Sequence, residues 1–166
     1  MNKAVFLDRD GVLIIDTEYP GDPKTIRFIP GIGPAVKSLN QKGFKVIVIS
    51  NQSGIARGFF PEENVNKINE KINKKLGEEG ARIDAFYYCP HHPDENCQCR
   101  KPKTGMLEQA GKDFGIDFKK SWMIGDAIKD VECGEKAGCK TILLSKEKHE
   151  KYKTAENLLE AAKIVE

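Results

Sequence analysis

Short apolar runs alternate with amphipathic segments along the whole chain. The apolar runs predict buried strands at residues 4–7, 44–49, 83–88, 121–124 and 140–144. Apolar residues at helical spacing predict helices at residues 31–43, 61–75, 104–114, 127–137 and 154–165. Strands and helices that alternate in this way favour an α/β fold with a parallel sheet flanked by helices.

The length and composition of the chain are those of a globular protein. With 166 residues, 31% of them charged and 39% hydrophobic, we expect a single domain over residues 1–166. The net charge of +2 gives no general affinity for nucleic acid, and no apolar run is long enough to span a membrane. The first predicted strand begins at Ala4, which leaves no room for a leader peptide. We therefore expect a cytoplasmic protein. It should be a monomer, because no long apolar stripe remains beyond those the core uses.

Two aspartates directly follow the first predicted strand, in the sequence Leu7-Asp8-Arg9-Asp10-Gly11. Because side chains alternate along an extended chain, residues 8 and 10 point in the same direction. Two carboxylates held that close repel each other, and a hard divalent cation such as Mg²⁺ would relieve the repulsion. Asp-x-Asp-Gly is also ordinary turn chemistry, so the pattern alone leaves both interpretations open.

A polar run, Ser50-Asn51-Gln52-Ser53-Gly54, ends the second predicted strand. Ligands gather at the carboxyl ends of strands in open α/β sheets. Hydroxyl and amide groups, together with free backbone N–H groups, can bind phosphoryl oxygens there. A polar loop that merely caps the strand would have the same composition, so this run is a second open signal.

Cysteine and histidine concentrate between residues 89 and 99. Cys89, His91, Cys97 and Cys99 form a Cys₃His set, and thiolates with an imidazole suit tetrahedral Zn²⁺. The segment has little apolar content, so a bound metal would replace a core. The alternative is a set of free surface thiols. From the residues alone, His92 competes with His91 as the fourth ligand.

Three cations follow the zinc loop directly, in Arg100-Lys101-Pro102-Lys103. Basic clusters of this kind usually form a solvated surface. Here they lie between a predicted metal loop and a predicted helix, which would fix their position. Fixed cations at strand ends are what a phosphate site requires.

The fourth predicted strand ends in Gly125-Asp126. Asp126 can cap the helix that follows, or it can be a third metal carboxylate facing Asp8 and Asp10, and both roles can coexist. Asp130 lies one helical turn later on the same side and could orient Lys101.

These signals occur in order, each at a predicted strand end, and together they resemble the haloacid dehalogenase superfamily of phosphohydrolases. The segments L-D-R-D-G-V, S-N-Q-S-G-I-A-R-G, C-x-C-R-K-P-K-T-G-M and M-I-G-D look like the branch that contains heptose bisphosphate phosphatases and histidinol-phosphatase domains. The resemblance covers nearly the whole chain. It implies a Rossmann-like parallel sheet flanked by helices, a zinc-binding loop at residues 89–99 and no separate cap domain.

Carried over by position, the resemblance also implies roles for single residues. Asp8 would be the nucleophile that forms an aspartyl-phosphate, and Asp10 the general acid/base. Asp8, the backbone carbonyl of Asp10 and Asp126 would bind Mg²⁺. Ser50 and Lys101 would hold the transferring phosphoryl group. The zinc ligands would be Cys89, His91, Cys97 and Cys99, and the substrate would contact Asn51, Gln52, Arg57 and Arg100.

The implied activity is a Mg²⁺-dependent phosphatase that removes the 7-phosphate of a heptose 1,7-bisphosphate. Histidinol phosphate or another small sugar phosphate is the nearest alternative substrate. A phospho-receiver signalling module also has an acceptor aspartate and Mg²⁺, but it needs neither Asp10 as an acid nor a zinc loop. A catalytically idle zinc-bearing protein would not need Asp8, Asp10, Lys101 and Asp126 together.

Overall fold

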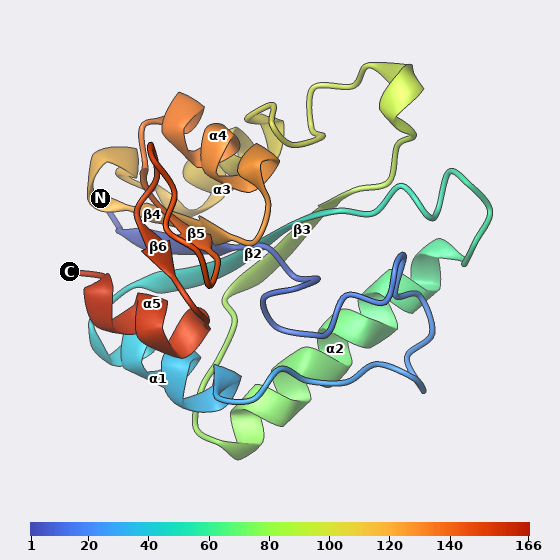
Figure 1. The fold of residues 1–166 in the computed structure, drawn as a ribbon. Helices are drawn as coiled ribbons and strands as arrows, with labels where there is room; N and C mark the ends of the chain where they lie inside the picture. Colours follow the sequence, from blue (N-terminus) through green and yellow to red (C-terminus); the bar gives the residue numbers. More distant parts are fainter.

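The computed structural model describes residues 1–166 and contains one sheet in which every strand pair is parallel. The strands lie in the order β3-β2-β1-β4-β5-β6 (Figure 1). This arrangement confirms the predicted parallel α/β sheet. The six strands are β1 (Ala4–Leu7), β2 (Lys45–Asn51), β3 (Ala85–Cys89), β4 (Trp122–Gly125), β5 (Lys140–Leu144) and β6 (Thr154–Ala155).

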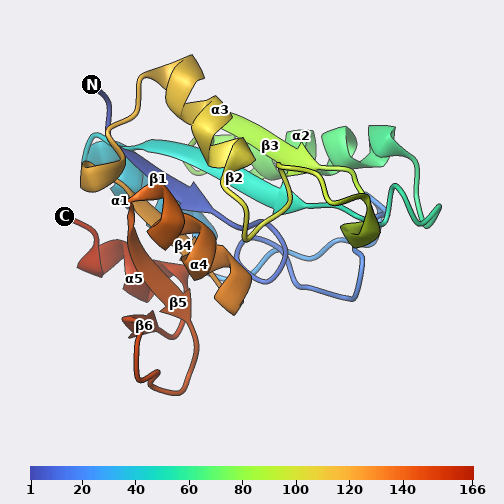
Figure 2. The same ribbon diagram turned by 90° about the horizontal axis from the view of Figure 1, so that it is seen from above.

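Helices cover both faces of the sheet (Figures 1 and 2). On one face lie α1 (Ile32–Gln41), α2 (Glu62–Glu78) and α5 (Leu158–Ile164), and on the other α3 (Gly105–Phe114) and α4 (Ile128–Ala137). Two short 3₁₀ helices, η1 (Pro93–Glu95) and η2 (Phe118–Lys120), lie in connecting segments. None of the helices combines the length and the apolar character that crossing a bilayer requires.

β1 is buried on both of its faces, as its continuous apolar sequence predicts. Val5 and Leu7 belong to the larger apolar core, which α1, α2 and α5 complete. Ala4 and Phe6 point the other way, into the smaller core beneath α3 and α4. The strand order reverses at β1, which lies between β2 and β4. In open α/β sheets a crevice forms at such a point, outside the carboxyl ends of the strands.

The C-terminal segment differs from the expectation. The predicted helix at residues 154–165 is wrong in its first turn, because Thr154 and Ala155 pair with Leu143 and Leu144 as strand β6. Helix α5 begins only at Leu158, after Asn157, whose Oδ1 accepts the backbone N–H of Glu160 at 2.9 Å. A side-chain cap of this kind fixes a helix start more firmly than apolar spacing does.

Candidate active site

A fully buried lysine lies at the carboxyl ends of β1 and β2. Nζ of Lys101 lies 2.9 Å from Oδ1 of Asp8 and 2.7 Å from Oδ1 of Asp130, and it donates to the carbonyl of Ile49 at 2.8 Å. Burial alone would lower the pKa of Lys101, but the charges of Asp8 and Asp130 outweigh it and raise the pKa above its ordinary value. The lysine therefore stays protonated between two carboxylates.

Asp126 completes a cluster of acidic groups with Asp8 and Asp130. One carboxylate oxygen of each lies within 4.8 Å of the others. Gly11, with φ of +86°, allows this approach, since a Cβ there would collide with the Asp126 carboxylate. Although water reaches Asp126, the surrounding protein partly desolvates it. This desolvation, with repulsion by Asp8 and Asp130, raises the pKa of Asp126 to about 7. Crowded carboxylates of this kind fit a hard cation such as Mg²⁺.

Asp126 does not cap helix α4, so that expectation is wrong. The cap position is Ala127, whose backbone N–H is bound by Oδ2 of Asp130 at 3.1 Å. One carboxylate oxygen of Asp130 thus accepts the hydrogen bond at the start of the helix, and the other contacts Lys101. The Asp126 carboxylate belongs to the acidic cluster.

Replacing Asp126 with Asn is expected to stabilise the metal-free protein. The raised pKa means that ionising Asp126 costs the folded state free energy. This cost grows as the pH rises from the ordinary pKa of 3.8, and it is complete above the raised pKa of about 7. We expect a gain of only about 1 kcal/mol at pH 8, because solvent screens this side chain. Little change is expected at pH 4, where the carboxyl is largely protonated in the folded state and partly protonated in the unfolded state. Thermal unfolding at both pH values measures it. Added Mg²⁺ should raise Tm of the wild type only, and an equal rise in the variant would contradict a role of Asp126 in binding.

Asp10 has different surroundings from Asp8. Its Oδ1 lies 2.8 Å from Nε of Arg9, and its Oδ2 accepts a hydrogen bond from Nε2 of Gln52 at 3.0 Å. Burial raises the pKa of Asp10, although the charge of Arg9 opposes the rise. Its side chain is therefore no member of the acidic cluster, and the two aspartates have distinct electrostatic environments.

The polar run after β2 holds the site together. Oδ1 of Asn51 accepts the backbone N–H of Lys101 at 2.9 Å, and Nδ2 of Asn51 donates to the Lys101 carbonyl at 3.2 Å. Nε2 of Gln52 donates to Oγ of the buried Ser50 at 2.6 Å, and the Gln52 backbone N–H donates to the carbonyl of Cys89 at 2.8 Å. These amides fix the Lys101 backbone and the end of β3 against β2.

A cavity of about 310 Å³ opens above these groups. Among the predicted site residues it is lined by Asp8, Asp10, Asn51, Gln52, Arg100, Lys101 and Asp126. Nη1 of Arg100 is buried without a hydrogen-bond partner, so it is available to an anion.

Two of the residues predicted to contact the substrate, Ser50 and Arg57, lie outside that lining. Ser50 is buried beneath the polar run. Arg57 is exposed, donates from Nε to Oγ of Ser53 at 3.2 Å, and places its guanidinium 5.4 Å from the ring centre of Tyr19. Tyr19 itself lines the cavity, so Arg57 reaches the rim through an aromatic neighbour.

Sequence reasoning missed several residues of this site. The most prominent is Arg9, whose side chain is fully buried against Asp10. A cation between two aspartates at the end of a buried strand was the signal that could have found it. The cavity lining also includes Asp16, Glu18, Tyr19, Pro20, Ser53, Ala127 and Lys129.

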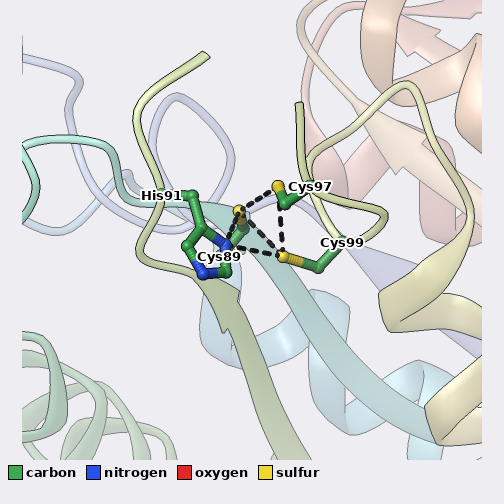
Figure 3. Close-up of side chains that lie close together, drawn as sticks. All are labelled: Cys89, His91, Cys97 and Cys99. Atoms are coloured by element: carbon green, nitrogen blue, oxygen red, sulfur yellow. Dashed lines mark hydrogen bonds between the residues drawn. The ribbon is translucent and has the colours of Figure 1, made fainter. Parts of the chain in front are cut away.

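The side chains of the Cys₃His set converge on one point, as Figure 3 shows. Sγ of Cys89 lies 3.5 Å from Sγ of Cys97 and 3.0 Å from Sγ of Cys99, and Nδ1 of His91 lies 3.2 Å from Sγ of Cys99. Tetrahedral zinc, with bonds of about 2.0–2.3 Å, places its ligand atoms about 3.5–3.8 Å apart. The four groups therefore fit Zn²⁺ after a small outward shift.

His92 points to a different task. Its Nδ1 accepts the backbone N–H of Asp94 at 3.1 Å, at the start of the short helix η1. The structure thus groups His91, and not His92, with the three cysteines.

The electrostatics of the thiols also fit a bound cation. Burial raises the pKa of Cys89 and Cys99. Burial opposes ionisation of Cys97 as well, but the backbone N–H of Arg100 and the neighbouring thiols lower its pKa to about 6. Without a metal, one thiolate is favoured at neutral pH, and the other two would need the charge of a cation to ionise.

Comparisons with known proteins agree with this geometry. A family model described as HAD-hydrolase-like matches residues 98–166. The D-glycero-beta-D-manno-heptose-1,7-bisphosphate 7-phosphatase of Haemophilus ducreyi is 46% identical over 149 residues, which cover 86% of this chain and 82% of that protein. The chain belongs to the haloacid-dehalogenase-like hydrolase family. Within that family, the Helicobacter pylori protein of the same name is 40% identical, with coverage of 86% and 83%.

A solved structure shows the same HAD-like fold. The crystal structure of D,D-heptose 1,7-bisphosphate phosphatase from B. bronchiseptica, complexed with magnesium and phosphate, has a TM-score of 0.89 and 32% sequence identity. The match covers 98% of this chain and 97% of that chain. The similarity therefore extends over nearly the whole chain of this HAD-like hydrolase.

Proposed function

We propose that this protein is a Mg²⁺-dependent phosphatase that removes the 7-phosphate of D-glycero-D-manno-heptose 1,7-bisphosphate. The observation that carries the proposal is the carboxylate of Asp8, which lies in the cavity against the buried cation of Lys101 and beside Asp126. Relatives at 40–46% identity bear the name of this activity for the β anomer, so we propose that anomer as the preferred substrate.

Asp8 is oriented for attack on phosphorus. Its Oδ1 accepts the backbone N–H of Arg9 at 2.9 Å and the Lys101 ammonium at 2.9 Å, so the carboxylate is held in one orientation. Its attack would form an aspartyl-phosphate, which divides a very slow hydrolysis into two easier steps. Lys101 and the Ser50 hydroxyl would stabilise negative charge on the phosphoryl oxygens.

Asp10 would supply the proton that the leaving sugar oxygen needs. Burial raises the pKa of Asp10, and this shift favours the protonated carboxyl group that a general acid needs. The same group, once deprotonated, would accept a proton from the water that hydrolyses the aspartyl-phosphate.

Mg²⁺ would be held by Asp8, Asp126 and the backbone carbonyl of Asp10, and it would neutralise charge on the transferring phosphoryl group. The remaining side chains of the site would bind the sugar and its second phosphate. These are Asn51, Gln52, Arg100 and, at the rim, Arg57.

Zinc would have a structural role in residues 89–99. Cys99 is followed directly by Arg100 and Lys101, so the metal would fix the segment that delivers both cations to the cavity. Thiols kept for a metal require a reducing compartment, which supports a cytoplasmic location. We further propose a single domain without a separate cap, acting as a monomer.

Phosphate release tests the proposal. With Mg²⁺ present, the α and β anomers of heptose 1,7-bisphosphate are compared with histidinol phosphate. We expect kcat/KM for the β bisphosphate to exceed that for histidinol phosphate by at least about 100-fold. Histidinol phosphate lacks the groups that the polar side chains of the site would bind, and those side chains would stay unpaired. Equal rates on all three would refute the substrate assignment. A long-lived aspartyl-phosphate without turnover would favour a phospho-receiver.

A further inference from the structure

Arg9, the residue between the two aspartates, is a fully buried cation. Its Nε lies 2.8 Å from Oδ1 of Asp10, and its Nη2 donates to Oδ2 at 3.4 Å. A guanidinium that faces both oxygens of a carboxylate fixes the plane of that carboxylate as well as its position. Together with Nε2 of Gln52, which donates to Oδ2 at 3.0 Å, Arg9 therefore sets the orientation of the Asp10 side chain.

Two further contacts hold the guanidinium itself. Nη2 donates to the carbonyl of Pro20 at 3.3 Å, and Nη1 donates to Oδ1 of Asn69 at 3.3 Å. Pro20 belongs to the loop that lines the cavity. Asn69 is a buried residue of α2 that lies outside the cavity lining. Arg9 thus connects Asp10 to a cavity loop and to a helix of the scaffold.

A purely structural role explains this arrangement poorly. Burial of a cation costs free energy, and an apolar side chain of similar volume would fill the space without that cost. The turn after β1 does not need the guanidinium, because the backbone carbonyl of Arg9 already accepts the N–H of Leu13 at 2.9 Å. The shortest contact of the guanidinium is the one with Asp10.

We propose that Arg9 is a positioning residue, which holds Asp10 where its proton can reach the leaving oxygen, and that Asn69 anchors Arg9 in that position. This inference rests on the proposed phosphatase function. In the first step, an oxygen of Asp8 bonds to phosphorus, the bond between phosphorus and the sugar oxygen breaks, and the proton of Asp10 passes to that oxygen. Misplacing Asp10 slows this step only when the leaving oxygen needs the proton.

The leaving group therefore provides the test. A sugar alkoxide is a poor leaving group that needs protonation, whereas p-nitrophenolate leaves without it. The quantity to compare is kcat/KM at one fixed pH with Mg²⁺, because it reports phosphoryl transfer to Asp8 and excludes the later hydrolysis step. The substrates are heptose 1,7-bisphosphate and p-nitrophenyl phosphate.

Two variants and one matched control suit this comparison. Arg9→Lys keeps the buried charge but loses the fork that faces Asp10, and Asn69→Ala removes only the anchor. The control is Asn73→Ala on the same helix, since Oδ1 of Asn73 accepts the backbone N–H of Ile83 at 3.1 Å and is not among the groups that hold Arg9. If Arg9→Lys fails to fold, the comparison of Asn69→Ala with Asn73→Ala still tests the proposal.

We expect kcat/KM for the sugar phosphate to fall about 30-fold in Arg9→Lys and about 5-fold in Asn69→Ala, part of the 10²–10⁴-fold effect of a general acid. For p-nitrophenyl phosphate both variants should lose less than about 3-fold, and Asn73→Ala should leave the ratio of the two substrates unchanged. Equal losses on both substrates, or the same ratio in Asn69→Ala as in the control, would overturn the inference. A wild type that hydrolyses neither substrate would instead refute the proposed function, and the inference would fall with it.

Discussion

Asp8→Asn is expected to lower kcat by on the order of 10⁵-fold, the usual size of the loss when a covalent nucleophile is removed. A neutral amide neither attacks phosphorus nor forms the aspartyl-phosphate. The fold should survive, because the amide oxygen can still accept the Arg9 N–H and Lys101 keeps its ion pair with Asp130. Phosphate release under saturating substrate measures the loss, and thermal unfolding confirms that the variant is folded.

The same chemical change elsewhere provides the control for Asp8→Asn. Asp113→Asn alters an exposed residue of α3 whose carboxylate binds Tyr87 and Gln109, so its kcat should stay within about 2-fold of the wild type. Mass spectrometry of the trapped reaction should find the phosphorylated chain in the wild type and not in Asp8→Asn. Turnover by Asp8→Asn comparable to that of Asp113→Asn would show that another group is the nucleophile.

The local patterns of the sequence were sufficient for the framework of the site. The apolar run of β1 and the β-branched run of β2 predict strands that are buried on both faces. Each strand ends in polar residues at the same edge of the sheet. The Cys₃His set could be found because its four ligands lie within eleven residues of the chain, so no tertiary information was needed.

What sequence reasoning missed depends on contacts between distant parts of the chain. Asn69 meets Arg9 across 60 positions, and Asn51 meets Lys101 across 50. Asn69 does not differ, in its own neighbourhood, from a solvated polar residue. Asn51 was predicted to contact the substrate, but its local sequence gives no sign of its hydrogen bonds to the Lys101 backbone. Strand β6 has only two residues, too few for a periodic pattern, and the apolar spacing of the helix that follows obscured it.

The orientation of Asp10 shows a further limit. Alternation along a strand predicts that residues 8 and 10 point the same way, and both do line the cavity. Alternation does not predict which cation each carboxylate contacts. The buried Arg9 forms an ion pair with Asp10, whereas Lys101 forms one with Asp8. Separate cations for the two carboxylates can give them different chemical roles, which the pattern D-x-D alone does not assign.

Removal of the zinc ion that we propose for the Cys₃His set is expected to destabilise the protein and to weaken catalysis together. Residues 90–99 are connected by turns and one short helix and contribute almost no buried apolar side chains, so the metal would be their main cross-link. Cys99→Ser should lower the free energy of unfolding by about 3 kcal/mol, within the range for loss of a structural metal ligand. We expect kcat to fall about 10-fold or more, since a misplaced Lys101 stabilises the phosphoryl charge less well.

A second cysteine variant distinguishes the effect of losing zinc from the effect of losing a thiol. Cys139→Ser changes a half-buried cysteine outside the Cys₃His set, so it should retain about one zinc ion per chain and nearly full activity. Zinc content, measured by atomic emission, should fall in Cys99→Ser and after chelation of the wild type. Lys101 explains why activity should follow: its backbone is held on one side by Asn51 and on the other by the segment that zinc would fix. If stability and kcat stay unchanged after confirmed zinc loss, the hydrogen bonds of Asn51 alone place Lys101, and the metal has no structural role in the site.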